Sequence, residues 1–188
     1  GAPTTQEYDD CGSNCLSGGQ HVLTVARTDR NPSGIAITDA FTYLDRYERP
    51  LVTRTKQFGS GYTWRQFQYN ARGLLWRTSV PCVTDQTTAG CATHWSELAY
   101  DVVGRVSRST RPGEGGATLA TQFSYQGLRT TITDPLNKVS SKVVDTAGRL
   151  YRSTDANQYT QTFTYDALGS LTRVSDSAET LVGASYEY

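Results

Sequence analysis

The stretch YTQTFTYDALG, Tyr159–Gly169, joins a run of alternating aromatic and polar residues to a tight-turn signature. Alternation at a period of two favours a strand of roughly 6 residues over a helix of 10 or more. Phe163 and Tyr165 lie two residues apart, so their rings share one face of that strand. The residues Asp166 to Gly169 then predict a turn that reverses the chain direction.

The same turn signature occurs six more times along the chain. Tyr8–Gly12 and Tyr100–Gly104 match it fully, whereas Tyr69–Gly73 and Val144–Gly148 each change one signature residue. Leu44–Glu48 and Tyr125–Gly127 are more divergent copies. The sequence therefore assigns structural turn roles to Asp9, Gly12, Asp45, Gly73, Asp101, Gly104, Gly127, Asp145, Gly148, Asp166 and Gly169.

The residue types explain why this signature makes a turn. The Asp side chain accepts hydrogen bonds from backbone amides just ahead of it, and the Gly supplies a positive φ. Glu48 stands where that Gly belongs. A residue with a Cβ there must adopt a strained conformation or the turn must change shape, so we expect the unit near Asp45 to be irregular.

A second turn series accompanies the first in the C-terminal third. Gly127, Gly148 and Gly169 lie 21 residues apart, and the members of the second series, Asp134, Asp155 and Asp176, are spaced equally. Each period holds two turns and two strand-like segments, which predicts an all-β fold: a repetitive antiparallel hairpin array in one curved sheet. We expect the array to span residues 1–188, with irregular repeats and long loops over 1–99 and regular repeats over 100–188.

Three aromatic pairs, of which Phe163 and Tyr165 are one, predict a ladder of stacked rings across neighbouring hairpins. The others are Phe67 with Tyr69 and Phe123 with Tyr125. Residues 93–100 suit either a helical turn or a strand, and we favour the strand. The segments 29–34 and 107–116 are rich in turn formers and predict loops.

Bulk properties exclude several classes of protein. Eighteen basic residues balance eighteen acidic ones, so no net charge favours nucleic acid or an anionic membrane. The sequence contains no apolar run long enough for a transmembrane helix and no signal peptide. It contains no Met, and it stops at Tyr188 where the next Asp of the pattern is expected. We therefore expect a fragment of a longer array.

The Tyr-Asp-x-x-Gly-Arg pattern followed by a Thr-Asp-x-x-Asn turn resembles the Rhs family, also called YD-repeat proteins. Tyr100–Val106, Asp145–Leu150, Tyr165–Leu171 and Thr133–Asn137 carry this resemblance. It implies a sheet that spirals into a hollow shell. In bacterial Rhs proteins and Tc-type insecticidal toxins such a shell encloses a toxic cargo, and in the animal teneurins a related shell serves cell adhesion.

The resemblance implies a secreted bacterial shell segment, with the rest of the shell and an enclosed toxin or effector as partners. The alternative is an extracellular adhesion module that binds a glycan or protein receptor through exposed tyrosines. The family's autoproteolytic Asp-Pro-x-Gly signature is not matched, because Asn137 replaces the Gly of Asp134-Pro135. We do not assign protease activity.

The sequence predicts no enzyme, cofactor or metal site. The only histidines, His21 and His94, lie near no nucleophile motif. Residues 29–34 resemble the start of a calcium loop, but Ala40 stands where the final Glu ligand belongs, so a polar turn is favoured. The second Asp series offers a cation ladder, yet turn capping explains it without metal.

The four cysteines form two local pairs. Cys11 and Cys15 lie four residues apart, and Cys82 and Cys91 lie nine apart. An even number of closely spaced cysteines predicts two disulfides in an oxidising compartment. A zinc site from Cys11, Cys15 and His21 is the weaker alternative because a fourth ligand is lacking.

Overall fold

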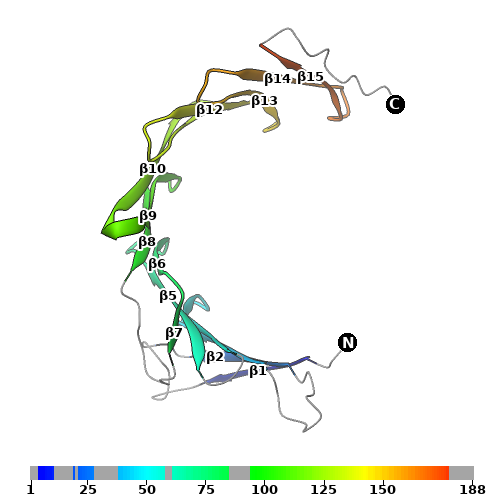
Figure 1. Cartoon of the computed structure of the whole chain (residues 1–188). Coiled ribbons are helices and arrows are strands. Elements are labelled where there is room, and N and C mark those ends of the chain that lie inside the picture. The colour runs from blue at the N-terminus through cyan, green and yellow to red at the C-terminus, as the bar shows by residue number, and fades with distance from the viewer. Residues whose placement is uncertain are drawn as a thin grey trace. The chain divides into compact units, whose positions relative to one another are not determined.

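The computed structural model describes residues 4–10, 19, 21–27, 38–57, 61–84 and 94–177. These residues form antiparallel strands joined mostly by tight turns, with one short 3-10 helix, η3 (Glu114–Gly116) (Figure 1). The predicted all-β antiparallel hairpin array is confirmed. No helix within the described ranges is long and apolar enough to cross a membrane. The chain separates into two compact units, Gly1–Leu98 and Ala99–Tyr188.

In the first unit the strands follow the order β1-β2-β3-β4-β5-β6-β8, so neighbours in sequence are mostly neighbours in the sheet. Their bounds are β1 Thr4–Asp10, β2 His21–Arg27, β3 Thr38–Leu44, β4 Pro50–Lys56, β5 Tyr62–Tyr69, β6 Leu75–Ser79, β7 Cys82–Thr84 and β8 Trp95–Tyr100. Strand β7 lies off this path and pairs with β5. The predicted strand over residues 93–100 is confirmed as β8.

Along one of its sides, strand β5 pairs with two different strands, β7 and β6. Its first residues pair with β7, with Trp64 opposite Cys82, and its last residues pair with β6, with Phe67 opposite Thr78. The amide of Gln66 lies between these two ladders and donates to the Ser79 hydroxyl at 2.9 Å. Ser79 is only 2% exposed, so this side chain supplies a hydrogen bond that no strand supplies there.

The hydrophobic core lies in the first unit around Tyr43, Val52 and Trp64. Val52 and Trp64 are 0% and 1% exposed. The Arg54 guanidinium adds a polar layer to this cluster, because its carbon lies 4.1 Å from the Phe41 ring centroid. Cation–π contact of this kind lets an arginine stem pack among aromatic rings without an acidic partner.

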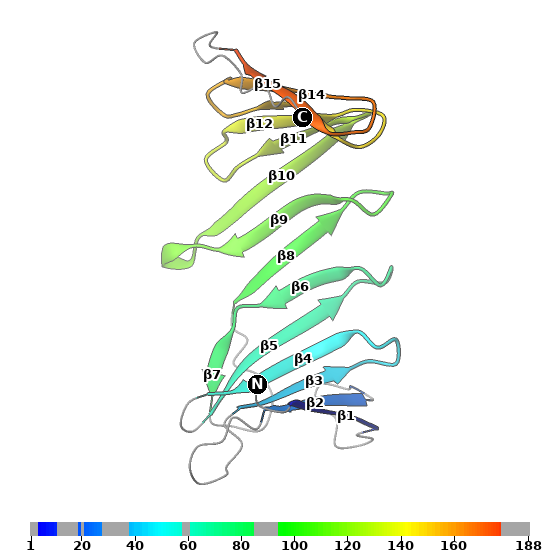
Figure 2. The same ribbon diagram turned by 90° about the vertical axis from the view of Figure 1, so that its right-hand side faces the viewer.

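In the second unit the strands β9 to β15 lie side by side in strict chain order (Figure 2). Their bounds are β9 Val106–Pro112, β10 Thr118–Gln126, β11 Arg129–Thr133, β12 Val139–Val144, β13 Leu150–Thr154, β14 Thr160–Tyr165 and β15 Leu171–Asp176. These strands are rich in Thr, Val and aromatic residues, which suit a pleated and partly buried surface.

The sheet of this second unit is a single layer. None of the described residues 99–177 is buried, and all are half-buried or exposed. Within the unit, no described strand or helix covers either face of β9–β15 (Figures 1 and 2). An ordinary domain buries one sheet face against a second layer, so this sheet lacks the usual source of stability.

Two sequence predictions are wrong in detail. Residues 107–112 were predicted to lie in a loop but belong to β9, because the ladder with β10, from Arg108 opposite Gln122 to Pro112 opposite Thr118, overrides the weak strand propensity of serine. Asp9 was predicted to lie in a turn but lies inside β1, opposite Val22. The β1–β2 ladder continues to Asp10, and the connection from residue 11 to 20 is too long for a four-residue turn.

Candidate functional site: the hairpin turns and their clamps

One hydrogen-bond pattern recurs at the strand ends. In the turn that begins at Asp145, the carboxylate oxygen Oδ1 accepts from the amides of Ala147 and Arg149, both at 2.9 Å. The amide of Gly148 donates to the Asp145 carbonyl at 3.0 Å, and the Asp145 amide donates to the Arg149 carbonyl at 2.8 Å. The turns that begin at Asp45, Asn70, Asp101, Asp134, Asp155 and Asp166 repeat all four bonds.

The fourth residue of each turn has a positive φ. Gly148 has φ 81°, and Gly73, Gly104 and Gly169 lie between 76° and 91°. The other three turns place Glu48, Asn137 or Gln158 there, with φ between 59° and 67°. The two turn series of the sequence are therefore one structure, in which the fourth residue need not be Gly.

The turn at Asp45 is not irregular, contrary to expectation. Its four hydrogen bonds match those at Asp145. Of the two outcomes anticipated for Glu48, the structure has the first, because Glu48 adopts φ 59° and the turn keeps its shape. A left-handed conformation costs about 1–2 kcal/mol for a residue with a Cβ, and the capped turn imposes it here.

The Gly127 connection differs from the others. Gln126 pairs with Arg129, so the loop between β10 and β11 contains two residues, Gly127 and Leu128. Only the first has a positive φ, at 56°, which fits a hairpin turn of type II′.

Three of the turns carry an additional clamp made of an arginine and a tyrosine. In the clearest copy, Arg149 Nε donates to Asp145 Oδ2 at 2.8 Å, and its guanidinium carbon lies 4.8 Å from the Tyr165 ring centroid. The Tyr165 hydroxyl donates to the carbonyl of Leu150 at 2.9 Å. The arginine immediately precedes β13 and the tyrosine ends β14, so the clamp joins two neighbouring strands at the ends where the turns lie.

The second clamp has the same geometry around Arg105. Its Nε donates to Asp101 Oδ2 at 2.7 Å, and its guanidinium carbon lies 4.2 Å from the Tyr125 ring centroid. The Tyr125 hydroxyl donates to the Val106 carbonyl at 2.7 Å.

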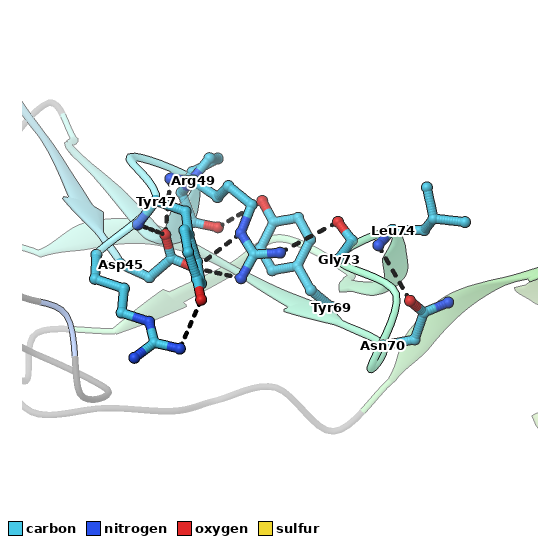
Figure 3. Close-up of polar contacts among 9 residues, drawn as sticks. Asp45, Tyr47, Arg49, Tyr69, Asn70, Gly73 and Leu74 are labelled. Carbon is cyan, nitrogen blue, oxygen red and sulfur yellow. Dashed lines mark hydrogen bonds and ion pairs between the residues drawn. The ribbon is translucent and has the colours of Figure 1, made fainter. Parts of the chain in front are cut away.

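The third clamp reaches the following turn as well (Figure 3). Arg49 binds Asp45 through Nε and Nη2, at 2.8 and 2.6 Å, and lies 4.3 Å from the Tyr69 ring centroid. The Tyr69 hydroxyl donates to the Pro50 carbonyl at 2.9 Å. Arg49 Nη1 also donates to the carbonyl of Gly73 at 3.2 Å. A Cβ on Gly73 would lie 3.1 Å from this nitrogen, so the close approach favours glycine in addition to the positive φ of 76°.

The clamps hold their carboxylates in the charged form. Burial pushes the pKa of Asp45 upward, but hydrogen bonds from the Arg49 side chain and from the amides of Arg49 and Tyr47 outweigh it, and the pKa lies below the usual 3.8. The balance at Asp101 is similar, with Arg105 as the main donor. At Asp145 the Arg149 amide has the largest effect, and it again lowers the pKa.

These contacts explain the order of residues in the repeat. Tyr165 receives Arg149 of the preceding turn, and Asp166, which follows it, begins the next turn. Tyr69 and Tyr125 receive an arginine in the same way but are followed by Asn and Gln. Where that preceding turn has no Arg, the Tyr is dispensable: Val144 precedes Asp145, and the connection before it is the two-residue turn at Gly127. The Arg after Gly belongs to the repeat pattern in the sequence, but its spacing alone does not predict this role.

The predicted ladder of stacked rings is wrong. Among the six described rings of the three pairs, none is in contact with another, and the tyrosines stack on arginines instead. Tyr69, Tyr125 and Tyr165 lie at or next to the last residues of β5, β10 and β14, so several strands separate them. At about 4.8 Å per strand, this spacing exceeds the reach of a ring.

The remaining predicted residues are only partly within the described ranges. Cys82 is described and is not a free thiol, but Gly12, Cys11, Cys15 and Cys91 lie outside, so both disulfide pairings stay predictions. Asp176 ends β15, and residues 178 and 179 of its predicted turn lie outside as well. Within the described ranges no group of three or more His, Cys, Asp or Glu is placed to hold a metal.

Two open cavities border the Arg49 clamp. One of about 350 Å³ is lined by Asp45, Arg49, Leu51 and Gln66–Tyr69. The other, of about 480 Å³, lies between the turns at Asp45 and Asn70 and is lined largely by arginine, tyrosine and backbone. Neither lining contains a histidine or cysteine beside a carboxylate.

Similarity to solved structures identifies the fold. No protein-family model matches the sequence, and no curated protein matches it. Forty chains of solved structures do match. One is a chain of a mutant Tc holotoxin pore from Photorhabdus luminescens, with a TM-score of 0.62 and 16% identity over 84% of this chain. The chain has a YD-repeat fold. This YD-repeat segment spans only 10% of the matched chain.

Proposed function

We propose that the chain is a structural segment in the wall of a hollow YD-repeat shell that encloses a toxin or effector. The observation that carries the proposal is the single-layer sheet of β9–β15, which has no hydrophobic core of its own. Asp-Arg-Tyr clamps hold its strands together at the ends where the turns at Asp101 and Asp145 lie. The fold shared with a chain of a Tc holotoxin pore supports it. Its partners are then the neighbouring segments of the same shell and the cargo, in a secreted bacterial protein.

The proposed mechanism is steric. A wall one strand thick separates the cargo from proteases and from the producing cell, and the clamps close the ends of the hairpins where such a sheet frays most easily. We propose no catalytic step, cofactor or metal.

The adhesion alternative has less support. It requires the rings of Tyr69, Tyr100 and Tyr165 to be accessible in one patch, but Tyr100 is half-buried. The rings of Tyr69 and Tyr165 are half-buried beneath an arginine, and both hydroxyls are bonded to a backbone carbonyl. These tyrosines therefore fasten strands and offer little surface to a receptor.

Protease protection tests the proposal. The natural parent polypeptide is treated with trypsin, and survival of the cargo is followed by mass spectrometry. We expect an intact cargo in the native protein and faster cleavage after Asp145→Ala, which removes one clamp. Lys142→Ala, on the exposed surface of the neighbouring strand, is the matched control and leaves protection unchanged. A cargo that is digested equally fast in all three proteins contradicts enclosure.

A further inference from the structure

The two faces of the second unit differ in chemistry. Residues opposite one another in a ladder share a face, so the registers place Phe123, Tyr125, Phe163 and Tyr165 on one side. The other side carries Arg108, Arg129, Arg152 and Arg173, and we call it the arginine face. All four of these arginines are exposed.

The charge of the arginine face is uncompensated. No Asp or Glu lies on this face in the described strands β9–β15. The ion pairs of Asp101 with Arg105 and of Asp145 with Arg149 both belong to clamps and involve none of these four arginines. The four arginines therefore present a positive field on a molecule whose net charge is zero.

The arginines lie close enough to act together. Arg129 and Arg152 belong to one cross-strand row, with Val143 between them. Two strand spacings separate them by about 10 Å, which is comparable to the Debye length of about 10 Å at 0.1 M salt. A flexible polyanion can therefore contact both at once.

The surroundings of the arginines suit a polypeptide. Ser124, Thr131, Ser141, Thr154 and Thr160 form the neighbouring row of the same face. Hydroxyl groups both donate and accept, so they match the amides and carbonyls of an extended chain. Single-stranded nucleic acid is held by stacking on aromatic side chains. The rings of Phe123, Tyr125, Phe163 and Tyr165 all lie on the opposite face.

We propose that the arginine face binds an acidic polypeptide segment through Arg108, Arg129, Arg152 and Arg173. The contact is electrostatic, with hydrogen bonds from the hydroxyl rows to the peptide groups. This inference goes beyond enclosure and does not require it, since an acidic partner binds whether the sheet stands in a shell or alone.

Binding of fluorescent poly-L-glutamate to the 188-residue chain, immobilised at low density, tests the inference. At low salt we expect binding that weakens as salt rises. Arg129→Gln combined with Arg152→Gln weakens it by about 10-fold, because each exposed charge contact contributes only modestly. A second variant, Arg108→Gln with Arg173→Gln, weakens it comparably and guards against a folding defect in the first.

The matched control removes the same two charges from the opposite face. Arg111→Gln with Lys142→Gln lies on the aromatic side, and we expect less than about a 2-fold change. If all three variants weaken poly-L-glutamate binding equally, net charge alone explains the binding and the proposal is overturned. Absence of poly-L-glutamate binding at low salt overturns it too, as does tighter binding of oligo(dT) in a parallel titration.

Discussion

At the scale of single residues, the hairpin ends depend on three side chains that act together. The aspartate caps the turn, the arginine neutralises the aspartate and covers the tyrosine, and the tyrosine returns a hydrogen bond to the residue after the arginine. Each contact alone is weak because these groups are half-exposed. Together they hold the ends of neighbouring strands in place beside the turns, where a sheet has few other contacts.

Removing one hydroxyl measures part of a clamp. Tyr165→Phe deletes the bond to the Leu150 carbonyl, and we expect the opening free energy of the β13–β14 amides to fall by about 0.5–1.5 kcal/mol in hydrogen exchange. Tyr151→Phe, an exposed tyrosine on β13, is the control. Equal losses in both variants contradict a role for the hydroxyl bond.

The strained residue of the Asp45 turn predicts a stabilising substitution. Glu48→Gly relieves the left-handed conformation at φ 59°, and we expect a gain of about 0.5–1 kcal/mol in local opening free energy. Asn137→Gly in the equivalent position yields a smaller gain, because asparagine tolerates this conformation better. A loss of protection in Glu48→Gly is inconsistent with the strain assigned here.

The lowered carboxyl pKa values predict how the clamps respond to acid. A carboxyl whose pKa is lower in the folded state stabilises that state fully above its unfolded value near 3.8 and loses this contribution as pH falls through its folded value. We therefore expect amide protection at the Asp45 and Asp145 turns to remain constant from neutral pH to about 4 and to decline below that. A decline centred at pH 5–6 is the contrary result.

At the scale of elements, strand β5 pairs first with β7 and then with β6, and the Ser79 side chain supplies the hydrogen bond between these two ladders. Ser79→Ala removes the acceptor of the half-buried Gln66 amide, so we expect a loss of about 1 kcal/mol in local stability. Ser140→Ala, on the half-buried strand β12, is the control and is expected to change little. Hydrogen exchange of the β5 amides measures both, and an unchanged Gln66 amide in Ser79→Ala would rule out this role.

The hairpins themselves were predictable because the turn chemistry is local. Asp145 and Gly148 bond within five residues, so their spacing alone specifies the turn. The clamp was not predictable from the sequence, since Arg149 and Tyr165 are 16 residues apart and meet only after β13 and β14 pair. The extent of β9 was also not predictable from the sequence, because its serines adopt the strand conformation only when β10 pairs with them.

At the scale of the whole molecule, stability is distributed unevenly. The buried side chains among the described residues, including Trp64 and Val52, lie in Gly1–Leu98. None of the described residues 99–177 is buried. Backbone ladders and clamps hold this second sheet together, and no described strand or helix of the same unit covers either of its faces. A wall segment has this property, since neighbouring segments and contents complete its environment.

Sedimentation velocity combined with a thermal melt of the isolated 188-residue chain tests this account most directly. A single-layer segment without a core in its second unit is expected to self-associate through exposed strand surface and to melt over a broad range, without one sharp transition. A monodisperse monomer that unfolds in a single cooperative transition would contradict the proposed role as a piece of an enclosing wall.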